Sequence, residues 1–412
     1  MTRGVTSIWM RTFGYLALGE AATGLIRFGA LLWVARILEP AGFGVIGVGL
    51  AVAGYVLMAH SGMEAVGVRR VAADPDDPRR HVEELVGARL AVAVVVYALM
   101  ALAVTAFPAG DEVRLVTLVY SLSLFTLALD LRWWFVATEE TRPVAVAATA
   151  GATGYLVGVL TLVRDPHDLI LVPVLHVGAE LLNAVVLAMW ARRRFGAFRP
   201  RLRATPWVRN LVESAPLSGI KVARAVMLGF DVVALKLLVG SAEAGQYAAA
   251  RRFALVGMIV VGLYFNAFLP RLVKVGRDSP QAGSALLRTA WLRSAILMIP
   301  LGVLGSLLAG PSVVLLLGDQ YRQAGTVLAW LVWTVVLASL IGPFQQALIA
   351  RDAAGSALAA TTVAAAVAVG VALFLIPRYT LVGAAVTAVV SEAVRLAGSI
   401  IAVRRTERCL VT

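Results

Sequence analysis

Ionisable residues inside long apolar segments are the part of this sequence that could do chemistry. Glu20 and Arg27 lie in one such segment, and Lys221, Arg224 and Asp231 lie in another. Glu20 is seven residues from Arg27, as Arg224 is from Asp231, and on an α-helix this spacing puts two side chains on one face, roughly 10 Å apart along the axis. Because charge facing lipid is unfavourable, we expect both faces to point into a helix bundle or a wet cavity.

These residue types suggest a site for an anion beside a site for a cation. Arginine and lysine in a wet cavity replace the hydration of a phosphate, and isolated carboxylates bind H⁺ or Na⁺. Two further apolar segments carry Asp130 with Arg132 and Glu392 with Arg395; the last pair, three residues apart, is typical of a structural ion pair. The candidate substrate-binding residues are Arg27, Lys221, Arg224 and Arg132, and the candidate ion-coupling residues are Glu20, Asp231 and Asp130. Alternatively, Glu20 and Asp231 only neutralise Arg27 and Arg224.

Motifs for catalysis and metal binding are absent from the sequence. It has no G-x-x-x-x-G-K-[ST] phosphate loop and no H-E-x-x-H helix, and its four histidines do not fall at zinc-ligand spacings. Asp74, Asp76 and Asp77 alternate with Pro75 and Pro78, which is typical of a solvated turn. His176 is expected to be packed or hydrogen-bonded rather than a ligand. We therefore expect no enzyme activity, no cofactor and no bound metal.

The composition predicts a polytopic membrane protein. Sixty per cent of the residues are hydrophobic, 15% are charged, and the mean hydropathy is +0.85. About 20 apolar residues span the hydrocarbon core as a helix. The sequence holds twelve such segments, at residues 12–36, 43–66, 86–107, 113–138, 143–163, 169–190, 209–239, 245–270, 285–309, 323–349, 354–376 and 380–403. The expected fold class is thus all-α, with about twelve transmembrane helices.

The placement of positive charge predicts the orientation in the membrane. The net charge is +13, yet the loops expected on the outer face hold only the arginines Arg36, Arg114, Arg164, Arg322 and Arg378. Because lysine and arginine are retained on the cytoplasmic side, both termini should be cytoplasmic. The arginine cluster at residues 192–209 is then a topology anchor on an anionic leaflet, and nucleic acid is not an expected partner.

The two halves of the sequence repeat one another. Ala41-Gly42-Phe43-Gly44 recurs as Ala244-Gly245-Gln246-Tyr247, and a single spacing of 212 residues relates Glu180 to Glu392 and Arg192-Arg193 to Arg404-Arg405. Internal duplication is common in secondary transporters, which hold substrate between their repeats. It predicts two six-helix pseudo-symmetric lobes around a central cavity, at residues 1–200 and 201–412.

Short motifs along most of the chain resemble those of a known family. They are ARILEPAGFG at residues 35–44, EAGQYAAA at 243–250, LGDQY at 317–321, and IPRY at 376–379 followed by GAA at 383–385. They resemble Wzx-like polysaccharide biosynthesis flippases of the multidrug, oligosaccharidyl-lipid and polysaccharide exporter superfamily. The resemblance implies two six-helix lobes that work by alternating access. It implies an undecaprenyl-pyrophosphate-linked oligosaccharide as cargo, carried across the bacterial cytoplasmic membrane.

The resemblance also implies site residues and partners. In related lipid II flippases, arginines on the first helix and its second-half counterpart line the cavity, and Arg27, Lys221 and Arg224 correspond to them in location. Those flippases carry an extra pair of C-terminal helices, which makes a peptidoglycan precursor a less favoured cargo for twelve spans. Candidate partners are membrane lipids, H⁺ or Na⁺, a polysaccharide polymerase and glycosyltransferases.

The sequence leaves three alternative functions open. An ion-coupled exporter of cationic drugs from the same superfamily should have a cavity dominated by carboxylates, whereas cations match or exceed acids in the segments around Arg27 and Arg224. A non-transporting membrane enzyme of polysaccharide assembly should carry a sizeable outer loop, and the loops expected outside are short. A membrane scaffold without transport activity is the third.

The orientation can be tested with the single cysteine, Cys409. A membrane-impermeant maleimide should label it only after spheroplasts are permeabilised, because the C-terminal tail is expected in the cytoplasm. Labelling in intact spheroplasts would overturn this topology. A cysteine introduced at Arg164, in a loop expected outside, serves as the positive control in a Cys409→Ser background.

Overall fold

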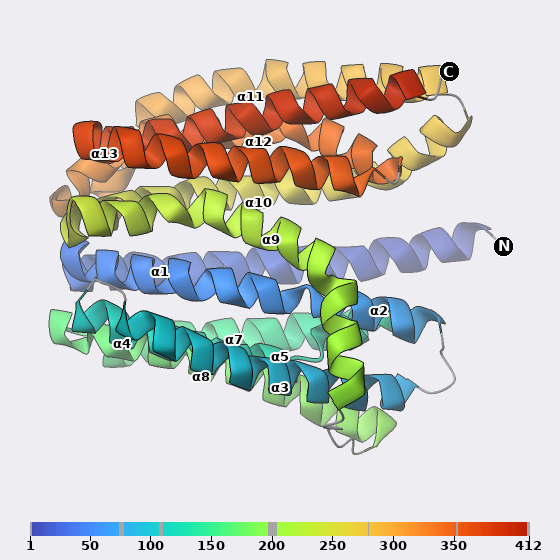
Figure 1. Cartoon of the computed structure of the whole chain (residues 1–412), viewed down its shortest axis with the longest axis horizontal. Coiled ribbons are helices and arrows are strands. Elements are labelled where there is room, and N and C mark those ends of the chain that lie inside the picture. Colours follow the sequence, from blue (N-terminus) through green and yellow to red (C-terminus); the bar gives the residue numbers. More distant parts are fainter. Residues whose placement is uncertain are drawn as a thin grey trace. The chain divides into compact units, whose positions relative to one another are not determined.

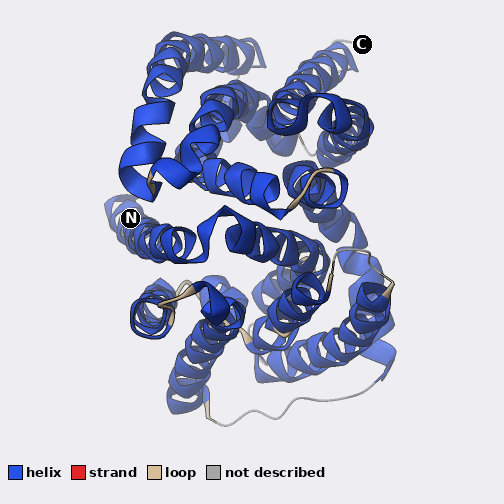
Figure 2. Cartoon of the chain, turned by 90° about the vertical axis from the view of Figure 1, so that its left-hand side faces the viewer, coloured by secondary structure: helices blue, strands red, loops and turns tan. Residues whose placement is uncertain are grey.

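The computed structural model describes residues 2–73, 78–106, 110–196, 204–278, 280–351 and 353–409. The described residues are almost entirely helical, and none of them forms a strand (Figure 2). The expected all-α fold class is confirmed. Apolar runs of this length must satisfy their backbone hydrogen bonds internally when they cross a bilayer, and the helix does so within one segment.

The first half of the chain forms eight α-helices and one short 3₁₀ helix among its described residues (Figure 1). They are α1 (Thr2–Ser61), α2 (Met63–Ala73), α3 (Pro78–Thr105), α4 (Asp111–Ser121), α5 (Ser123–Leu129), α6 (Arg132–Ala137), α7 (Thr141–Leu162), η1 (Pro166–Ile170) and α8 (Leu171–Phe195).

Longer helices make up the second half. They are α9 (Ala204–Leu238), α10 (Ser241–Asp278), α11 (Pro280–Leu317), η2 (Asp319–Tyr321), α12 (Arg322–Ala350) and α13 (Ala354–Cys409). By length and composition, eight stretches of the described residues could cross a membrane: 22–71, 79–105, 111–137, 141–162, 166–194, 281–317, 319–350 and 355–406.

Two of these stretches, of 50 and 52 residues, each contain two expected spans joined at a kink. In α1 the kink is at Glu39, whose φ of 57° lies in the left-handed region, and Pro40 follows it. In α13 it is at Thr380, with φ 47°, three residues after Pro377. Proline removes one helical hydrogen bond and clashes with the preceding turn, so both breaks follow from the sequence.

The chain divides into two compact units. Unit 1 comprises residues 1–38 and 48–222, and unit 2 comprises residues 39–47 and 223–412. The segment Glu39–Gly47, directly after the kink of α1, thus belongs to unit 2, and the first part of α9 belongs to unit 1.

Unit 1 is built on the antiparallel pair α7 and α8, with α3 packed on α4 and α5, and α2 packed on α6. A core of apolar side chains from α2, α3, α6, α7 and α8 fills one part of it, with Trp134 and Phe135 among the largest buried side chains. Nε1 of Trp33 on α1 donates to the carbonyl oxygen of Val163 at 3.0 Å, which holds α1 to the end of α7.

In unit 2, α12 packs against α10, α11 and α13. The two copies of the repeated motif also meet in this unit. A Cβ on Gly44 would overlap the carbonyl oxygen of Ser241, and one on Gly245 would overlap that of Pro40. Close backbone packing therefore explains why neither Gly44 nor Gly245 carries a side chain.

The close packing at Gly245 can be tested with one methyl group. Alanine normally stabilises a helix relative to glycine by about 0.5–1 kcal/mol. Gly245→Ala should nevertheless lower the thermal unfolding midpoint of the purified protein, because its Cβ has no room. Gly262→Ala, on the same helix with open space around the position, is the matched control and should leave the midpoint equal or higher. Equal midpoints for both variants would contradict the packing.

Candidate functional site

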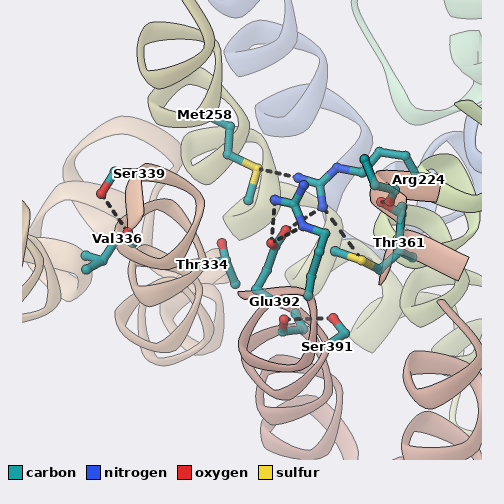
Figure 3. A network of polar contacts seen from close by, with 12 residues as sticks. Arg224, Met258, Thr334, Val336, Ser339, Thr361, Ser391 and Glu392 are labelled. Atoms are coloured by element: carbon teal, nitrogen blue, oxygen red, sulfur yellow. Dashed lines mark hydrogen bonds and ion pairs between the residues drawn. The ribbon is translucent and has the colours of Figure 1, made fainter. Parts of the chain in front are cut away.

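A buried carboxylate held by two arginines is the central feature of unit 2. Nη1 of Arg224, on α9, lies 2.6 Å from Oε1 of Glu392 on α13. Nη2 of Arg395, one turn further along α13, lies 2.7 Å from Oε2 of the same glutamate. The side chain of Glu392 is 1% exposed, and that of Arg224 is 25% exposed. Figure 3 shows the two side chains pointing toward one another. The three groups together carry one net positive charge, and the pair of Glu392 with Arg395 expected from the sequence is present.

Arg224 makes its other contacts with thioether sulfurs. Nη1 lies 3.7 Å from Sδ of Met227, and Nη2 lies 3.9 Å from Sδ of Met258 (Figure 3). A guanidinium offers five N–H donors, and sulfur is a weak acceptor. Glu392 therefore anchors one edge of this guanidinium, while its remaining donors face groups that a stronger acceptor could replace.

Asp231 is engaged by a tyrosine rather than by Arg224. The hydroxyl of Tyr247, on α10, donates to Oδ2 of Asp231 at 2.8 Å, and Oδ1 has no hydrogen-bond partner among the described residues. The side chain of Asp231 is buried. The suggestion that Asp231 neutralises Arg224 is therefore wrong for this structure, because Arg224 reaches across to α13 and pairs with Glu392.

Asp231 and Glu392 both line a small cavity within unit 2, close to Arg224. Polar side chains converge on it from α9, α10, α12 and α13, and they are Asp231, Arg251, Thr334, Ser391 and Glu392. Met227 and Met258 are among the apolar lining residues. Carboxylate and hydroxyl oxygens beside a guanidinium could hold a small cation at one end and an anion at the other.

Lys221 has a local role in unit 1. Its ammonium donates to the carbonyl oxygen of Ser61 at 3.2 Å and to the Ser61 hydroxyl at 3.0 Å. One turn earlier on α9, the Ser218 hydroxyl donates to the carbonyl oxygen of Ala59 at 2.8 Å. The last carbonyls of a helix have no partner within the helix, and lysine is a common donor to them. Lys221 thus helps to cap α1.

Asp130 and Arg132 lie at a break between α5 and α6. Asp130 leaves the helix, with φ −68° and ψ 122°, and its Oδ1 accepts from the backbone N–H of Arg132 at 2.8 Å. The break frees backbone carbonyls, and the buried Arg89 on α3 donates to those of Leu127 and Asp130. Arg89 also pairs with Glu64 at 3.1 Å. This arrangement shapes the helix break, and the Arg132 side chain is exposed.

Arg27 and Glu20 are placed differently by the structure. The side chain of Arg27, on α1, is exposed. Glu20 lies in α1, but its side chain is outside those that the structure describes. Glu180, the repeat marker on α8, contacts His176 and Thr126. His176 is hydrogen-bonded, as expected from the sequence.

Sequence reasoning missed Arg89 and Tyr247 and treated Glu180 only as a marker of the repeat. Arg89 stands inside the expected span 86–107, so the cost of an unpaired charge could have identified it. Tyr247 carries no such signal, because a tyrosine is unremarkable in an apolar helix.

Comparisons with solved structures show the same fold in transporters. The lipid II flippase MurJ in an inward closed conformation superposes with a TM-score of 0.74 at 10% identity, over 94% of this chain and 87% of that chain. An inward-facing multidrug resistance MATE family transporter of the MOP superfamily gives 0.72 at 12% identity, over 94% of each chain. An outward-facing one gives 0.61 at 12% identity, over 98% and 96%. This chain therefore has the fold of MOP superfamily transporters and is a multi-pass membrane protein.

Sequence comparison identifies the family. Among curated proteins, no sequence matches this chain. The family model described as "Polysaccharide biosynthesis protein" matches residues 9–275. That region includes most of α1, all of α2 to α9 and most of α10, and with them Arg27, Arg224, Asp231 and Tyr247. The chain belongs to the polysaccharide biosynthesis protein family.

Proposed function

We propose that the protein is a flippase that moves an undecaprenyl-pyrophosphate-linked oligosaccharide across the bacterial cytoplasmic membrane by alternating access. The observation that carries the proposal is the cationic cluster of Arg224, Glu392 and Arg395, in which two guanidiniums share one buried carboxylate. An excess positive charge among membrane helices is costly unless a ligand uses it. The family and the fold support the same substrate class.

A pyrophosphate needs such a group because its negative charge cannot cross hydrocarbon unpaired. Arg224 would provide charge-assisted hydrogen bonds to phosphate oxygens. Phosphate oxygens are strong acceptors, so they would take the donors that now face the sulfurs of Met227 and Met258. Glu392 would keep the guanidinium in position throughout. The polyprenyl tail would stay in lipid at a lateral opening.

Arg27, Lys221 and Arg132 remain proposed as further contacts of the anion. The exposed side chain of Arg27 favours this role most among the three. Lys221 would have to exchange its hydrogen bonds to Ser61 for hydrogen bonds to phosphate. Arg132 is the first residue of the short helix α6, directly after the interruption between α5 and α6. We rank the three residues in that order because each successive side chain would need a larger local rearrangement to reach the anion.

Asp231 is the candidate for ion coupling that the geometry favours. One of its carboxylate oxygens has no hydrogen-bond partner among the described residues, and the hydroxyls of Thr334 and Ser391 line the same cavity. Oxygen ligands of this kind suit Na⁺, and a buried carboxylate also takes up H⁺. Glu392, by contrast, is neutralised by two arginines. Glu20 and Asp130 remain proposed; the side chain of Asp130 already caps the start of α6.

An ion-coupled exporter of cationic small molecules is the second candidate. The methionines beside Asp231 favour it, because flexible thioether side chains adapt to varied apolar ligands and the carboxylate would attract a cation. MATE family transporters also share the fold. The two candidates differ in the sign of the charge that they require of the cargo. The first candidate also includes the proposals that both termini are cytoplasmic, that the protein lies in the bacterial cytoplasmic membrane, and that it interacts with a polymerase or glycosyltransferases.

The role of Arg224 can be tested by substitution. Arg224→Ala should reduce flipping of a pyrophosphate-linked oligosaccharide at least about 30-fold, since losing such a contact costs roughly 2 to 5 kcal/mol. The protein should stay folded because Arg395 still pairs with Glu392. Flipping is measured in proteoliposomes, beside the amount of folded protein by size-exclusion chromatography.

Two further variants serve as controls for Arg224. Arg322→Ala removes an exposed arginine that pairs with Asp319 and should transport normally. Arg224→Lys keeps the charge without the fork of donors and should recover part of the activity. Normal transport by Arg224→Ala would show that the cluster is structural.

Coupling can be tested at Asp231. In proteoliposomes, an imposed H⁺ or Na⁺ gradient should accelerate wild-type flipping, whereas Asp231→Asn should flip downhill but ignore the gradient, because an amide cannot exchange charge with the ion. Asp319→Asn, at an exposed carboxylate, is the control and should respond as wild type does. A wild-type protein insensitive to both gradients would exclude coupling and leave transport driven by consumption of product outside.

A further inference from the structure

Polar side chains hold the end of α1 to α9 within unit 1. The Ser218 hydroxyl donates to the carbonyl oxygen of Ala59 at 2.8 Å. The Lys221 ammonium donates to the carbonyl oxygen of Ser61 at 3.2 Å and to its hydroxyl at 3.0 Å. Gly62 directly follows α1, and a Cβ there would overlap the Ser218 hydroxyl. The two helices therefore pack closely here, and we call these five residues the α1–α9 contact.

The α1–α9 contact is polar and accessible to water. Ser61, Ser218 and Lys221 are half-buried, and none of the five residues belongs to the apolar core that α2, α3, α6, α7 and α8 form. An ion pair at 2.9 Å, between Arg70 of α2 and Glu213 of α9, supports the contact, and the glutamate side chain is 42% exposed. Water competes for accessible hydrogen bonds and ion pairs, so each contributes little net stability. The contact can therefore open while the apolar core stays intact.

The contact lies where α9 leaves unit 1. Lys221 is the last residue but one of unit 1, and from residue 223 the same helix belongs to unit 2. Alternating access moves one part of a transporter against another. A helix shared by two units transmits such a movement to the groups that hold it, and for α9 the nearest of these are at the end of α1.

The same lysine is next to the proposed substrate-binding arginine. Arg224 follows Lys221 by three residues on one continuous helix, and side chains at this spacing are neighbours on the helix surface. The acceptors of Lys221 at Ser61 are two neutral oxygens. A phosphate oxygen carries negative charge and attracts an ammonium more strongly than a neutral oxygen does. A phosphate bound at Arg224 would thus compete with Ser61 for Lys221.

We propose that the anionic substrate opens the α1–α9 contact and that this opening is a required step of transport. Phosphate binding to Lys221 removes its two hydrogen bonds to Ser61, and the Ser218 hydroxyl alone then holds the end of α1. The step exchanges hydrogen bonds and transfers no proton. Its role in transport rests on the proposed flippase function, whereas opening of the contact by a pyrophosphate does not.

The need for opening is tested with a disulfide across the contact, in a Cys409→Ser background. A Cβ at residue 62 would lie 3.0 Å from Cβ of Ser218. A disulfide spans about 3.5–4.5 Å between Cβ atoms, so Gly62→Cys with Ser218→Cys should crosslink after a small shift. In proteoliposomes the oxidised protein should lose flipping of a pyrophosphate-linked oligosaccharide, and dithiothreitol should restore it. Equal flipping by the oxidised and reduced proteins would overturn the proposal.

A matched disulfide separates this opening from any other restraint on α1. Gly47 is the last residue of the α1 segment that belongs to unit 2, and a Cβ there would lie 2.9 Å from Cβ of Ala248 on α10. Both positions lie within unit 2, and their packing is not expected to open. Gly47→Cys with Ala248→Cys should therefore flip equally when oxidised and reduced. Loss of flipping in both oxidised proteins would overturn a specific role of the α1–α9 contact.

A second crosslink is used if Gly62→Cys disturbs folding. Arg70→Cys with Glu213→Cys removes the ion pair between α2 and α9, and a short bis-methanethiosulfonate joins the two thiols in its place. This bridge should stop flipping until it is reduced. Unchanged flipping by the bridged protein would contradict the proposal as directly as the disulfide would.

The trigger is tested without transport, by the rate at which the 62–218 disulfide forms in detergent under a fixed oxidant concentration. Saturating farnesyl pyrophosphate should slow the reaction roughly tenfold, the effect of exchanging one hydrogen bond to a charged group, and farnesol should not. With Lys221→Gln added, the rate should ignore pyrophosphate. Equal rates with and without pyrophosphate in the Lys221 protein would overturn the proposal. Failure of wild type to flip any pyrophosphate-linked lipid would instead overturn the flippase function, and the rate would still decide whether an anion opens the contact.

Discussion

The constraint on which this structure depends is that a charge among membrane helices needs a partner. An ionised side chain left alone in an apolar interior costs several kcal/mol, and breaking a buried pair leaves that cost uncompensated. Each described charged residue buried deep in either unit meets an opposite charge or a hydrogen-bond donor. Glu392 has Arg224 and Arg395, Arg89 has Glu64, and Asp231 has the hydroxyl of Tyr247. The pair of Arg224 with Glu392 joins α9 to the distant α13, and the other contacts join neighbouring helices or turns of one helix. The charges that support function therefore also fix the packing.

Arg224 and Arg89 show how the same side chain can serve two purposes. The terminal nitrogens of Arg89 donate to one carboxylate and to two backbone carbonyls at a helix break, and its side chain is completely buried. Arg224 has one strong acceptor and two sulfurs, and a quarter of its side chain is exposed. A ligand could replace the sulfurs around Arg224, whereas at Arg89 it would have to break the structure. The strength of existing partners therefore separates a binding arginine from a structural one.

The sequence predicted the helices well and the partners poorly. Each of the twelve expected spans lies largely in helix among the described residues, because apolar length decides whether a segment can cross a bilayer, but the span 113–138 is divided among α4, α5 and α6. The kinks at Glu39 and Thr380 follow from the neighbouring prolines. Spacing along one helix correctly put Glu392 beside Arg395.

Spacing along one helix also suggested Asp231 as the partner of Arg224, which is wrong. The true partner comes from α13, and no pattern within α9 identifies the neighbouring helix. The same limit applies to Lys221, whose acceptors are at the end of α1. Asp130 and Arg132 were expected in one continuous helix, yet the helix is interrupted between α5 and α6. Partners contributed by other helices depend on tertiary packing, which the spacing of residues along one helix does not encode.

The central claim is that the cavity in unit 2 recognises a negatively charged pyrophosphate. The most direct measurement is the affinity of the purified protein for short soluble analogues with one common tail: farnesyl pyrophosphate, farnesyl phosphate and farnesol, titrated calorimetrically in detergent at two salt concentrations. The account predicts that affinity falls in that order, that the pyrophosphate advantage shrinks at high salt, and that Arg224→Ala removes it. Equal binding of all three compounds, or preferential binding of a lipophilic cation, would contradict it.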